Sequence, residues 1–202
     1  MSKLKEYNGH YCESEYEYAF IGFLGAEGWK YISGNSINRL NKRDVLIADD
    51  FKKFIEHTNP DLTSDEVTQI FDNVRLVGAE SDFATLHKVY GWMVDGIQFT
   101  SQDGLAKMVH LIDFENPNNN IFRVVNQFTI EYTSNGQKEN RRPDILLFVN
   151  GMPLCIIELK NPADAHATIY DAWEQINIRY WRDIPHLLHY CPLACISDGV
   201  KT

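Results

Sequence analysis

The stretch "RRPDILLFVNGMPLCIIELK", residues 141–160, contains the pattern that decides the fold. Two apolar runs, 144–149 and 154–159, are rich in Ile, Leu and Val and lie on either side of Asn150-Gly151. Runs of this kind predict β-strands, and Asn-Gly between them is the strongest short signal for a hairpin. We therefore predict an antiparallel pair of strands that turns at Asn150-Gly151.

Three charged residues lie in this apolar hairpin: Asp144 on the first strand, and Glu158 and Lys160 at the end of the second. Glu158 and Lys160 are two residues apart, so on a strand they point to the same face. A three-residue loop without a bulge would place Asp144 directly opposite Glu158, whereas another loop length or a bulge would change the pairing. The neighbouring residues of both strands would then point into the core: Ile145, Leu147, Ile157 and Leu159.

Two carboxylates brought together repel each other, and one of them is pushed toward protonation unless a cation is bound. Mg²⁺ prefers oxygen ligands and needs few protein carboxylates, so Asp144, Glu158 and the carbonyl of Leu159 form a candidate site for Mg²⁺, or for Mn²⁺ in its place. A metal there can polarise a phosphodiester, and Lys160 can orient water or neutralise charge on the phosphate. The alternative is a solvated ion network at the edge of a sheet.

The rest of the chain divides into a helical first part and a strand-rich second part. We expect helices at about 14–27, at 43–57, from Thr63 onward with a Thr63–Glu66 capping box, and at 167–182, and an irregular or short helical piece at 83–95. From Gly96 on, period-two patterns predict further strands at 97–101, 108–114, 122–132 and 192–199. This order indicates an α/β (α+β) fold with a mixed central sheet flanked by helices. We expect one domain over 1–202, with a helical part at about 1–80 and the core at about 96–199.

Composition limits the possible functions. The chain has 202 residues, 44% of them hydrophobic, which is enough for one core. It has 19 Lys and Arg against 28 Asp and Glu, a net charge of −9, which argues against a free-standing nucleic-acid binder unless a local basic patch or a neighbouring domain supplies positive charge. We see no apolar run long enough for a membrane span and no secretion signal, so we expect a cytoplasmic protein with no membrane partner.

The four cysteines do not form a dense framework, and we expect reduced thiols at Cys12, Cys155, Cys191 and Cys195. His186, His189, Cys191 and Cys195 are zinc-type ligands within ten residues. Their spacing is too compressed for familiar tetrahedral pairs, and the cysteines fall near or in a predicted buried strand, so we do not expect zinc.

Pro143-Asp144, thirteen intervening residues and Glu158-Leu159-Lys160 together resemble the PD-(D/E)XK nuclease motif. The surrounding stretches "LIDFENPNNNIFRVVNQFTIEY", "RRPDILLFVNGMPLCIIELKNP" and "ISDG" resemble the N-terminal endonuclease domain of the R (restriction) subunit of type I restriction-modification enzymes. The resemblance is dense over 111–199, weaker in "ESEYEYAFIGFLGAEGWKY" and slight over 36–75.

The resemblance implies a restriction-endonuclease-like core that cleaves double-stranded DNA with Mg²⁺. It implies Asp144, Glu158 and Lys160 as catalytic residues, and Asp144, Glu158, Leu159 and Glu17 around the metal. It also implies modification and specificity subunits as partners, and a downstream motor that binds ATP. The chain has no G-x-x-x-x-G-K-[ST] motif, so we expect it to be an N-terminal fragment that does not itself hydrolyse ATP.

The family also has a Gln-xxx-Tyr signature on the helix after the lysine. The nearest match here, Gln175 and Tyr180, has one residue too many between them, and Ile176 stands four residues before Tyr180. The candidate DNA contacts are Gln175, Arg179, Tyr180, Arg182 and Arg142. The competing interpretations are a solvated helix face for the polar residues, a core position for Tyr180, and, for Glu17, the third position of a capping box started by Ser14.

Two further hypotheses stand beside the nuclease. One is a non-catalytic module that keeps the nuclease fold only to dock DNA or partner subunits; the net charge and the altered Gln/Tyr spacing favour it, and the intact acid–acid–lysine set opposes it. The other is a stand-alone nuclease of the same fold, which differs from the first reading in whether the gene continues past Thr202 into a motor.

Overall fold

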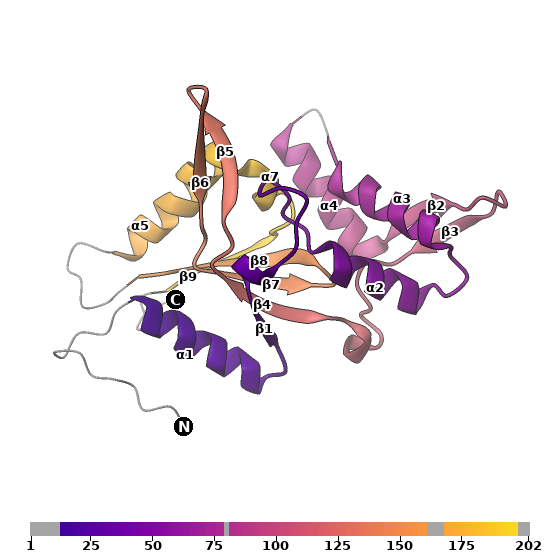
Figure 1. Ribbon diagram of the computed structural model, residues 1–202, viewed down its shortest axis with the longest axis horizontal. Coiled ribbons are helices and arrows are strands. Elements are labelled where there is room, and N and C mark those ends of the chain that lie inside the picture. Colours follow the sequence, from indigo (N-terminus) through magenta and orange to yellow (C-terminus); the bar gives the residue numbers. More distant parts are fainter. Residues whose placement is uncertain (1–12, 79–80, 161–167, 198–202) are drawn as a thin grey trace.

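The hairpin predicted around Asn150-Gly151 lies at the centre of a five-stranded sheet in the computed structural model of the chain (Figure 1). The structure describes residues 13–78, 81–160 and 168–197. The sheet order is β1-β4-β7-β8-β9, with the bounds β1 (Lys30–Ser33), β4 (Phe122–Asn126), β7 (Ile145–Val149), β8 (Met152–Leu159) and β9 (Leu193–Ser197). The two outer pairs are parallel and the two inner pairs antiparallel, so the predicted mixed sheet is confirmed.

The loop of the hairpin settles the register that the sequence left open. Asn150 and Gly151 both have positive φ, 51° and 77°, as a two-residue turn requires. Ile145 pairs with Ile157, but beyond Leu147 the register shifts by one, so that Leu154 is an extra residue on β8. The two-residue turn is one residue shorter than the loop that would pair Asp144 with Glu158, and the β-bulge supplies that residue. Asp144, which precedes Ile145, and Glu158, which follows Ile157, therefore lie opposite each other.

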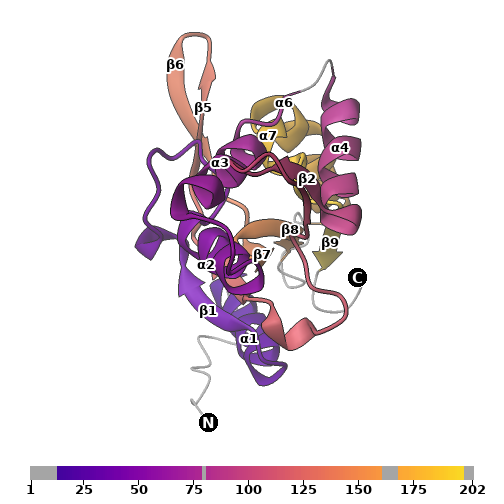
Figure 2. The same ribbon diagram turned by 90° about the vertical axis from the view of Figure 1, so that its right-hand side faces the viewer.

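Helix α1 (Glu13–Ala26) covers one face of the sheet (Figures 1 and 2). Its Ile21 packs in a cluster with four buried strand residues, listed as Val124, Ile145, Ile157 and Leu159. The helix already includes Glu13, so Ser14 lies within its first turn instead of preceding the helix as the predicted cap. The inward orientation predicted for the residues neighbouring the charges is confirmed, with Leu147 only half-buried.

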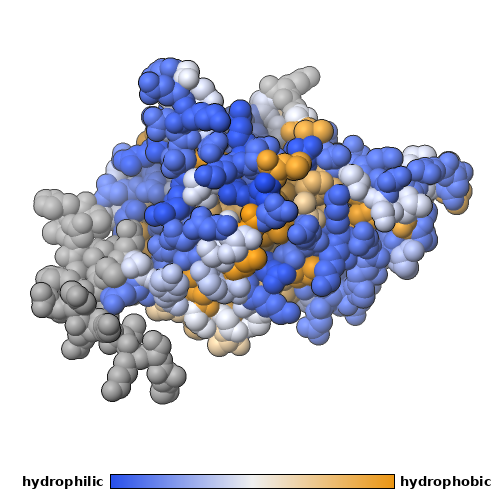
Figure 3. All heavy atoms as spheres, in the orientation of Figure 1, coloured by the Kyte–Doolittle hydropathy of each residue, from blue (hydrophilic) through white to orange (hydrophobic). Residues whose placement is uncertain are grey.

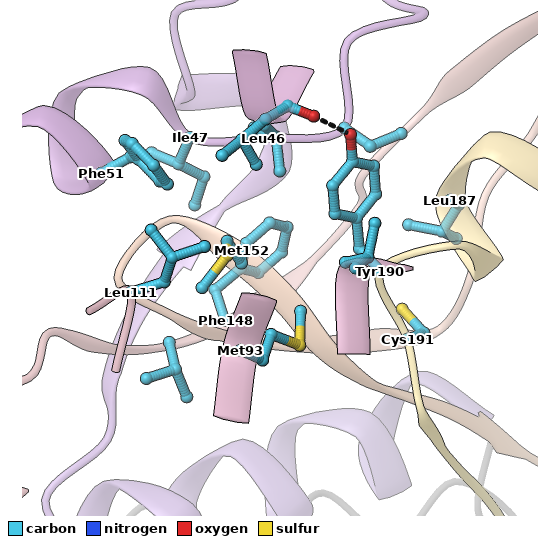
Figure 4. Close-up of a cluster of buried hydrophobic side chains, with 14 of the residues drawn as sticks. Leu46, Ile47, Phe51, Met93, Leu111, Phe148, Met152, Leu187, Tyr190 and Cys191 are labelled. Carbon is cyan, nitrogen blue, oxygen red and sulfur yellow. Dashed lines mark hydrogen bonds between the residues drawn. The ribbon is translucent and has the colours of Figure 1, made fainter. Parts of the chain in front are cut away.

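The larger core lies on the other face, where three helices pack toward the closed end of the hairpin. They are α2 (Ala48–Thr58), α3 (Ser64–Arg75) and α4 (Asp82–Asp95). Figure 4 shows Phe51 of α2 and Met93 of α4 around Phe148 and Met152 of the hairpin. A Cβ on Gly151 would collide with the backbone oxygen of Ile47, so the turn and the start of α2 are in close contact.

The helices predicted at about 43–57 and from Thr63 onward are present, and the structure contains one regular helix more than was predicted. Thr63 and Glu66 form both hydrogen bonds of the predicted capping box. The second helix begins at Ala48, later than the predicted residue 43. The segment 83–95, expected to be irregular or short, is a regular helix whose N-terminus is capped by Ser81, because the Ser81 hydroxyl accepts a hydrogen bond from the amide of Ala84.

Four shorter strands form two separate hairpins: β2 (Ile97–Thr100) with β3 (Ala106–Val109), and β5 (Ile130–Ser134) with β6 (Gln137–Arg141). The single strand predicted over 122–132 is wrong, because Gln127 has φ 57° and breaks the run into β4 and β5. The β5–β6 hairpin projects from the body of the molecule (Figure 1). Strand β1 was not predicted, and two short 3-10 turns, η1 (Gly34–Ser36) and η2 (Pro117–Asn119), complete this region.

The helix predicted over 167–182 is divided into three pieces. They are α5 (Ile169–Glu174), the π-helical turn η3 (Gln175–Tyr180) and α6 (Trp181–Asp183), and the short α7 (Pro185–Leu188) follows. Thr168 and Asp171 form a capping box at the start. On the inner side of this helical segment Ala172, Ile176 and Tyr180 are buried, while Trp173 is 43% exposed. None of the helices in the described ranges is both long enough and apolar enough to cross a bilayer.

Candidate active site

The structure brings Asp144 and Glu158 together at the open end of the central hairpin. The two carboxyl groups lie close enough for the charge of Asp144 to act on Glu158, and Asp144 Oδ2 accepts a hydrogen bond of 2.7 Å from the amide of Leu159. Burial raises the pKa of Asp144. Burial and the adjacent charge of Asp144 raise the pKa of Glu158 well above its ordinary value. The pair therefore holds a proton more tightly than two separate, exposed carboxyl groups would when no cation is present.

Glu158 is completely buried, and two further side chains hold its oxygens. The Tyr180 hydroxyl donates to Oε1 at 2.8 Å, and Gln175 Nε2 donates to Oε2 at 2.6 Å. Gln175 Nε2 also lies 2.7 Å from the Tyr180 hydroxyl oxygen, and Lys160 Nζ donates to Gln175 Oε1 at 3.3 Å. A continuous hydrogen-bonded network thus joins Lys160, Gln175, Tyr180 and Glu158.

The π-helical turn explains how Gln175 and Tyr180 reach the same carboxylate. In an α-helix of 3.6 residues per turn, side chains five residues apart point about 140° away from each other around the axis. A π-helix closes its hydrogen bonds from i to i+5, which returns residues five apart to the same side. The extra residue in the Gln/Tyr element is therefore absorbed by η3. Burial places Tyr180 in the core, the competing interpretation of this residue, with its hydroxyl on Glu158 and not on the surface.

The sequence itself contains a signal for this turn. Four apolar residues, Ala172, Ile176, Tyr180 and Ile184, recur at intervals of four, and all four are buried. In a regular α-helix that stripe would drift by about 40° at every step. A constant interval of four over three steps favours a locally wider turn, which is what the structure contains.

Glu17 comes from α1, on the face of the sheet opposite Tyr180. Its Oε2 accepts a hydrogen bond of 3.2 Å from Asn126 Nδ2, and Asn126 Oδ1 accepts one of 3.0 Å from the Tyr31 hydroxyl. Asn126 is fully buried and pairs in register with Ile145, the residue after Asp144. Sequence reasoning missed Asn126, although an amide at the end of the apolar run "FRVVN" is a recognisable exception to the strand pattern.

The arginines proposed as DNA contacts differ in their surroundings. Arg142 and Arg179 are exposed, and Arg142 donates to the side-chain oxygen of Gln127 at 2.8 Å. Arg182 forms an ion pair of 2.7 Å with Asp183, which also binds Arg141 at 2.6 Å. Arg182 therefore belongs to an ion cluster in which two cations share one carboxylate.

The donor set fits a hard divalent cation held by few protein ligands. Within the described ranges, no group of three or more His, Cys, Asp or Glu side chains is arranged around a common point. Mg²⁺ needs only one or two carboxylates and retains waters, and a cation between Asp144 and Glu158 would take the place of the tightly held proton. The zinc-type residues of the C-terminal part have separate partners: His189 contacts Asp82 at 2.8 Å, and Cys191 lies 3.3 Å from the carbonyl oxygen of Pro153.

Comparison with known proteins finds similarity to type I restriction enzyme subunits. The family model described as the type I restriction enzyme R protein N terminus matches residues 11–202. The chain is 34% identical over 196 residues to the "Putative type I restriction enzyme MjaIXP endonuclease subunit" of Methanocaldococcus jannaschii, covering 92% of this chain and 18% of that protein. It is 32% identical over 202 residues to the "Type I restriction enzyme HindI endonuclease subunit" of Haemophilus influenzae, covering 93% of this chain and 18% of that protein.

Proposed function

This chain belongs to the family of N-terminal regions of type I restriction enzyme R proteins, and from that premise we propose that it is the Mg²⁺-dependent, DNA-cleaving part of such a subunit. The observation that carries the proposal is a half-buried Asp144 beside the fully buried Glu158, with Lys160 two residues after Glu158 at the end of the same strand. An ion network with a purely structural role would not bring two carboxylates together away from water, because the desolvation and the repulsion of two like charges are unfavourable.

Asp144 and Glu158 would hold the metal, with the carbonyl of Leu159 as a further ligand, whereas Glu17 stands apart from this pair and is hydrogen-bonded to Asn126. The metal would polarise the phosphodiester and lower the pKa of a bound water. Lys160, as a compact cation on a flexible stem, would neutralise the phosphate or orient the water. The Leu159 amide fixes Asp144, and Tyr180 fixes Glu158, so both carboxylates are already oriented by the fold.

The partners of the proposed nuclease are proposed from its membership of the family. The chain spans 18% of the length of the two relatives named above. We place ATP binding and DNA movement in a motor outside this chain, and we assign target recognition to specificity and modification subunits. Arg142, Arg179 and Arg182 would meet the backbone of double-stranded DNA near the site, because phosphate contacts of this kind position a duplex without reading its sequence.

Asp144→Asn tests the proposal with little change in side-chain shape. We expect DNA cleavage by the complete restriction enzyme to fall roughly 1,000-fold or more, as for the loss of other central catalytic groups. Subunit assembly and DNA-dependent ATP hydrolysis should be unchanged, because they do not use this carboxylate. The control is Asp65→Asn, an exposed carboxylate in the first turn of α3. Cleavage at the wild-type rate by Asp144→Asn would instead favour the non-catalytic docking module.

A further inference from the structure

The outer part of the β5–β6 hairpin has polar side chains on both of its faces. The hairpin projects from the body of the molecule as a two-stranded ribbon (Figures 1 and 2), and its stretch "TSNGQKEN", residues 133–140, contains no apolar side chain. All of these residues except the half-buried Ser134 are exposed. At the base of the ribbon, by contrast, Ile130 and Tyr132 are buried in the core. Packing therefore accounts for the base of the hairpin but not for its outer part.

The base of the ribbon is fixed to the body of the molecule. The Arg141 guanidinium donates to Asp183 Oδ2 at 2.6 Å and lies over the Tyr132 ring, 5.2 Å from its centroid. On the other strand, the Glu131 amide donates to the Lys42 carbonyl oxygen at 3.1 Å. These contacts fix the direction in which the ribbon projects, so its outer part can present side chains to a partner with little further loss of conformational freedom.

The dimensions of the ribbon match the major groove of double-stranded DNA. Five residue pairs join its strands, and at about 3.4 Å per residue they give a length of about 17 Å. Asn135 and Gly136, with φ of 49° and 75°, form a two-residue turn, so the tip is no wider than the two strands. The major groove of B-DNA is about 12 Å wide and about 8.5 Å deep, and it admits a two-stranded ribbon. The outer part can therefore enter the groove while the base stays outside it.

Positive charge lies beside the ribbon and not on it. Within its outer part the charge of Lys138 is offset by that of Glu139. A hollow of about 510 Å³ lies between the hairpin and the α6–α7 segment, and the exposed Arg43 and Arg182 are among the residues that line it. Asp183 also lines the hollow, but two arginines bind its carboxylate. The hollow therefore favours an anion, and a backbone phosphate there would leave the neutral ribbon over the adjacent groove.

The side chains of the ribbon suit DNA better than a protein partner. Protein interfaces depend on buried aromatic and aliphatic anchors, which residues 133–140 lack. These residues provide hydroxyl, amide and ammonium groups, which are the groups that contact phosphate oxygens and base edges in DNA. A polar ribbon beside two arginines therefore favours a duplex as its partner.

The ribbon leads directly into the carboxyl pair. Arg142 and Pro143 are the only residues between Arg141, where β6 ends, and Asp144. Three residue steps span at most about 11 Å, so a duplex seated on the ribbon also lies close to the carboxyl pair. The exposed Arg142 lies at this junction, where it can meet the same phosphate backbone.

We propose that the outer part of the β5–β6 hairpin enters the major groove of double-stranded DNA, with Arg43 and Arg182 on the phosphates beside that groove. The inference rests on the proposed nuclease function and deepens it, because it assigns an element that holds the duplex against the carboxyl pair. The hairpin is then a binding element that takes no part in the chemistry of cleavage.

The test shortens the ribbon without changing its base. Deleting Thr133, Ser134, Gln137 and Lys138 removes two residue pairs, or about 7 Å of length, and keeps the Asn-Gly turn, the alternation of faces and the ion pair at the base. Lys138→Ala is the matched variant, with the same change in charge at full length. Lys53→Ala is the control, because it removes an exposed lysine on α2, away from the hairpin.

The measurement is the dissociation constant of the 202-residue chain for a short duplex at low salt, without a divalent cation so that no cleavage occurs. We expect the shortened hairpin to weaken binding by about tenfold, since it loses several hydrogen bonds to the groove, and Lys138→Ala by about two- to threefold. Lys53→Ala should bind as wild type does. In the complete restriction enzyme, the shortened hairpin should slow DNA cleavage and leave ATP hydrolysis unchanged.

A duplex with a filled major groove identifies which groove is used. A substituent at C5 of cytosine projects into the major groove, as the methyl group of thymine does. We expect wild type to bind a duplex containing glucosylated 5-hydroxymethylcytosine about fivefold or more weakly than the unmodified duplex, because the bulky group blocks the ribbon. The shortened chain should bind both duplexes equally. Equal binding of the two duplexes by wild type would overturn the proposal.

A shortened chain that binds DNA as tightly as Lys53→Ala does would also overturn it, and loss of subunit assembly in that variant would make the hairpin a protein contact. Circular dichroism shows whether the shortened chain is folded. If it is not, Arg43→Ala decides at full length: we expect the slope of log affinity against log salt to fall by about 1, and an unchanged slope contradicts the inference. Failure of the proposed function looks different, because Asp144→Asn would then cleave normally while these DNA affinities stayed as expected.

Discussion

At the scale of single residues, the carboxyl pair should make the metal-free chain sensitive to pH. The pKa values of Asp144 and Glu158 are both raised by burial, and that of Glu158 also by the Asp144 charge, so the folded state holds protons that the unfolded chain releases. The stability contributed by these two groups is complete at low pH, below their unfolded pKa values. It is lost as the pH rises through their raised folded pKa values.

We therefore expect the metal-free wild-type chain to lose stability relative to Asp144→Asn as the pH rises from the ordinary carboxyl range through the raised pKa values of the pair. The asparagine removes one of the two like charges and can donate a hydrogen bond to ionised Glu158. The measurement is the unfolding temperature of both chains across this range, with Asp65→Asn as the control for a carboxylate outside the pair. A constant difference between wild type and Asp144→Asn at all pH values would contradict the tightly held proton.

Mg²⁺ or Mn²⁺ should restore the stability that the same pair loses at high pH. A cation that takes the place of the proton removes the repulsion, so it should stabilise wild type most at high pH and have little effect on Asp144→Asn. The same titration of unfolding temperature, repeated with the cation, gives this comparison directly.

At the scale of elements, two turns offer a matched comparison of backbone strain and packing. Gly151 and Gly136 both sit second in an Asn-Gly turn, with φ of 77° and 75°. A Cβ on Gly151 would collide with the backbone of Ile47, whereas a Cβ on Gly136 would meet open space. The turn of the central hairpin therefore packs closely against the start of α2, whereas the turn of the projecting β5–β6 hairpin has no such close contact at Gly136.

Gly136→Ala should cost about 1 kcal/mol, for the conformation alone, and Gly151→Ala clearly more, because close contact adds to a strain of roughly 1–3 kcal/mol at positive φ. Urea unfolding of the two variants measures the difference. Equal losses for the two variants would mean that α2 can move away from the hairpin turn without cost.

The elements also show what sequence patterns can and cannot predict. The Asn-Gly hairpin and the Thr63–Glu66 capping box were predicted because their signals are local, within a few residues. Strand β1 was missed because its four residues acquire strand pairing only from the distant β4. The bulge at Leu154 and the π-helical turn could not be predicted from the sequence. Each is an irregularity within a regular strand or helix, and the packing of the residues on both sides of it holds it in place.

The candidate site, like the fold, could be predicted only in part from the sequence. The sequence placed Asp144, Glu158 and Lys160 in one hairpin but left their pairing open, because one residue of slip changes the face of every side chain. It did not reveal Asn126 beside Glu17, nor that Tyr180 would donate to Glu158, since both contacts join elements far apart in the chain.

At the scale of the whole molecule, a net charge of −9 has to be reconciled with DNA as the proposed substrate. Figure 3 shows a largely hydrophilic face with the projecting hairpin among its polar regions. Arg142 and Arg179 are exposed in the part of the chain that carries the carboxyl pair, and Lys53 lies on α2 at the other end of Figure 1. Local cations near the site, and not the total charge, would then decide how DNA is held.

Removing Arg179 should therefore weaken DNA binding in a salt-dependent way. For Arg179→Ala we expect the slope of log affinity against log salt to fall by about 1, as for the loss of one phosphate contact. Lys53→Ala is the control, with an equal change in net charge and no expected change in slope. DNA titrations of the complete enzyme at several salt concentrations measure both, and equal slopes for the two variants would mean that Arg179 does not face DNA.

The bulge at Leu154 has a consequence for how relatives of this chain are found in genomes. Because Leu154 has no partner on β7, a lineage can lose this one codon and keep Asp144 opposite Glu158 across the same Asn-Gly turn. Its motif would then have twelve intervening residues between the two acids instead of thirteen. A search pattern with one fixed interval would miss such descendants, although their active sites would superimpose, and a pattern that tolerates either interval would recover them.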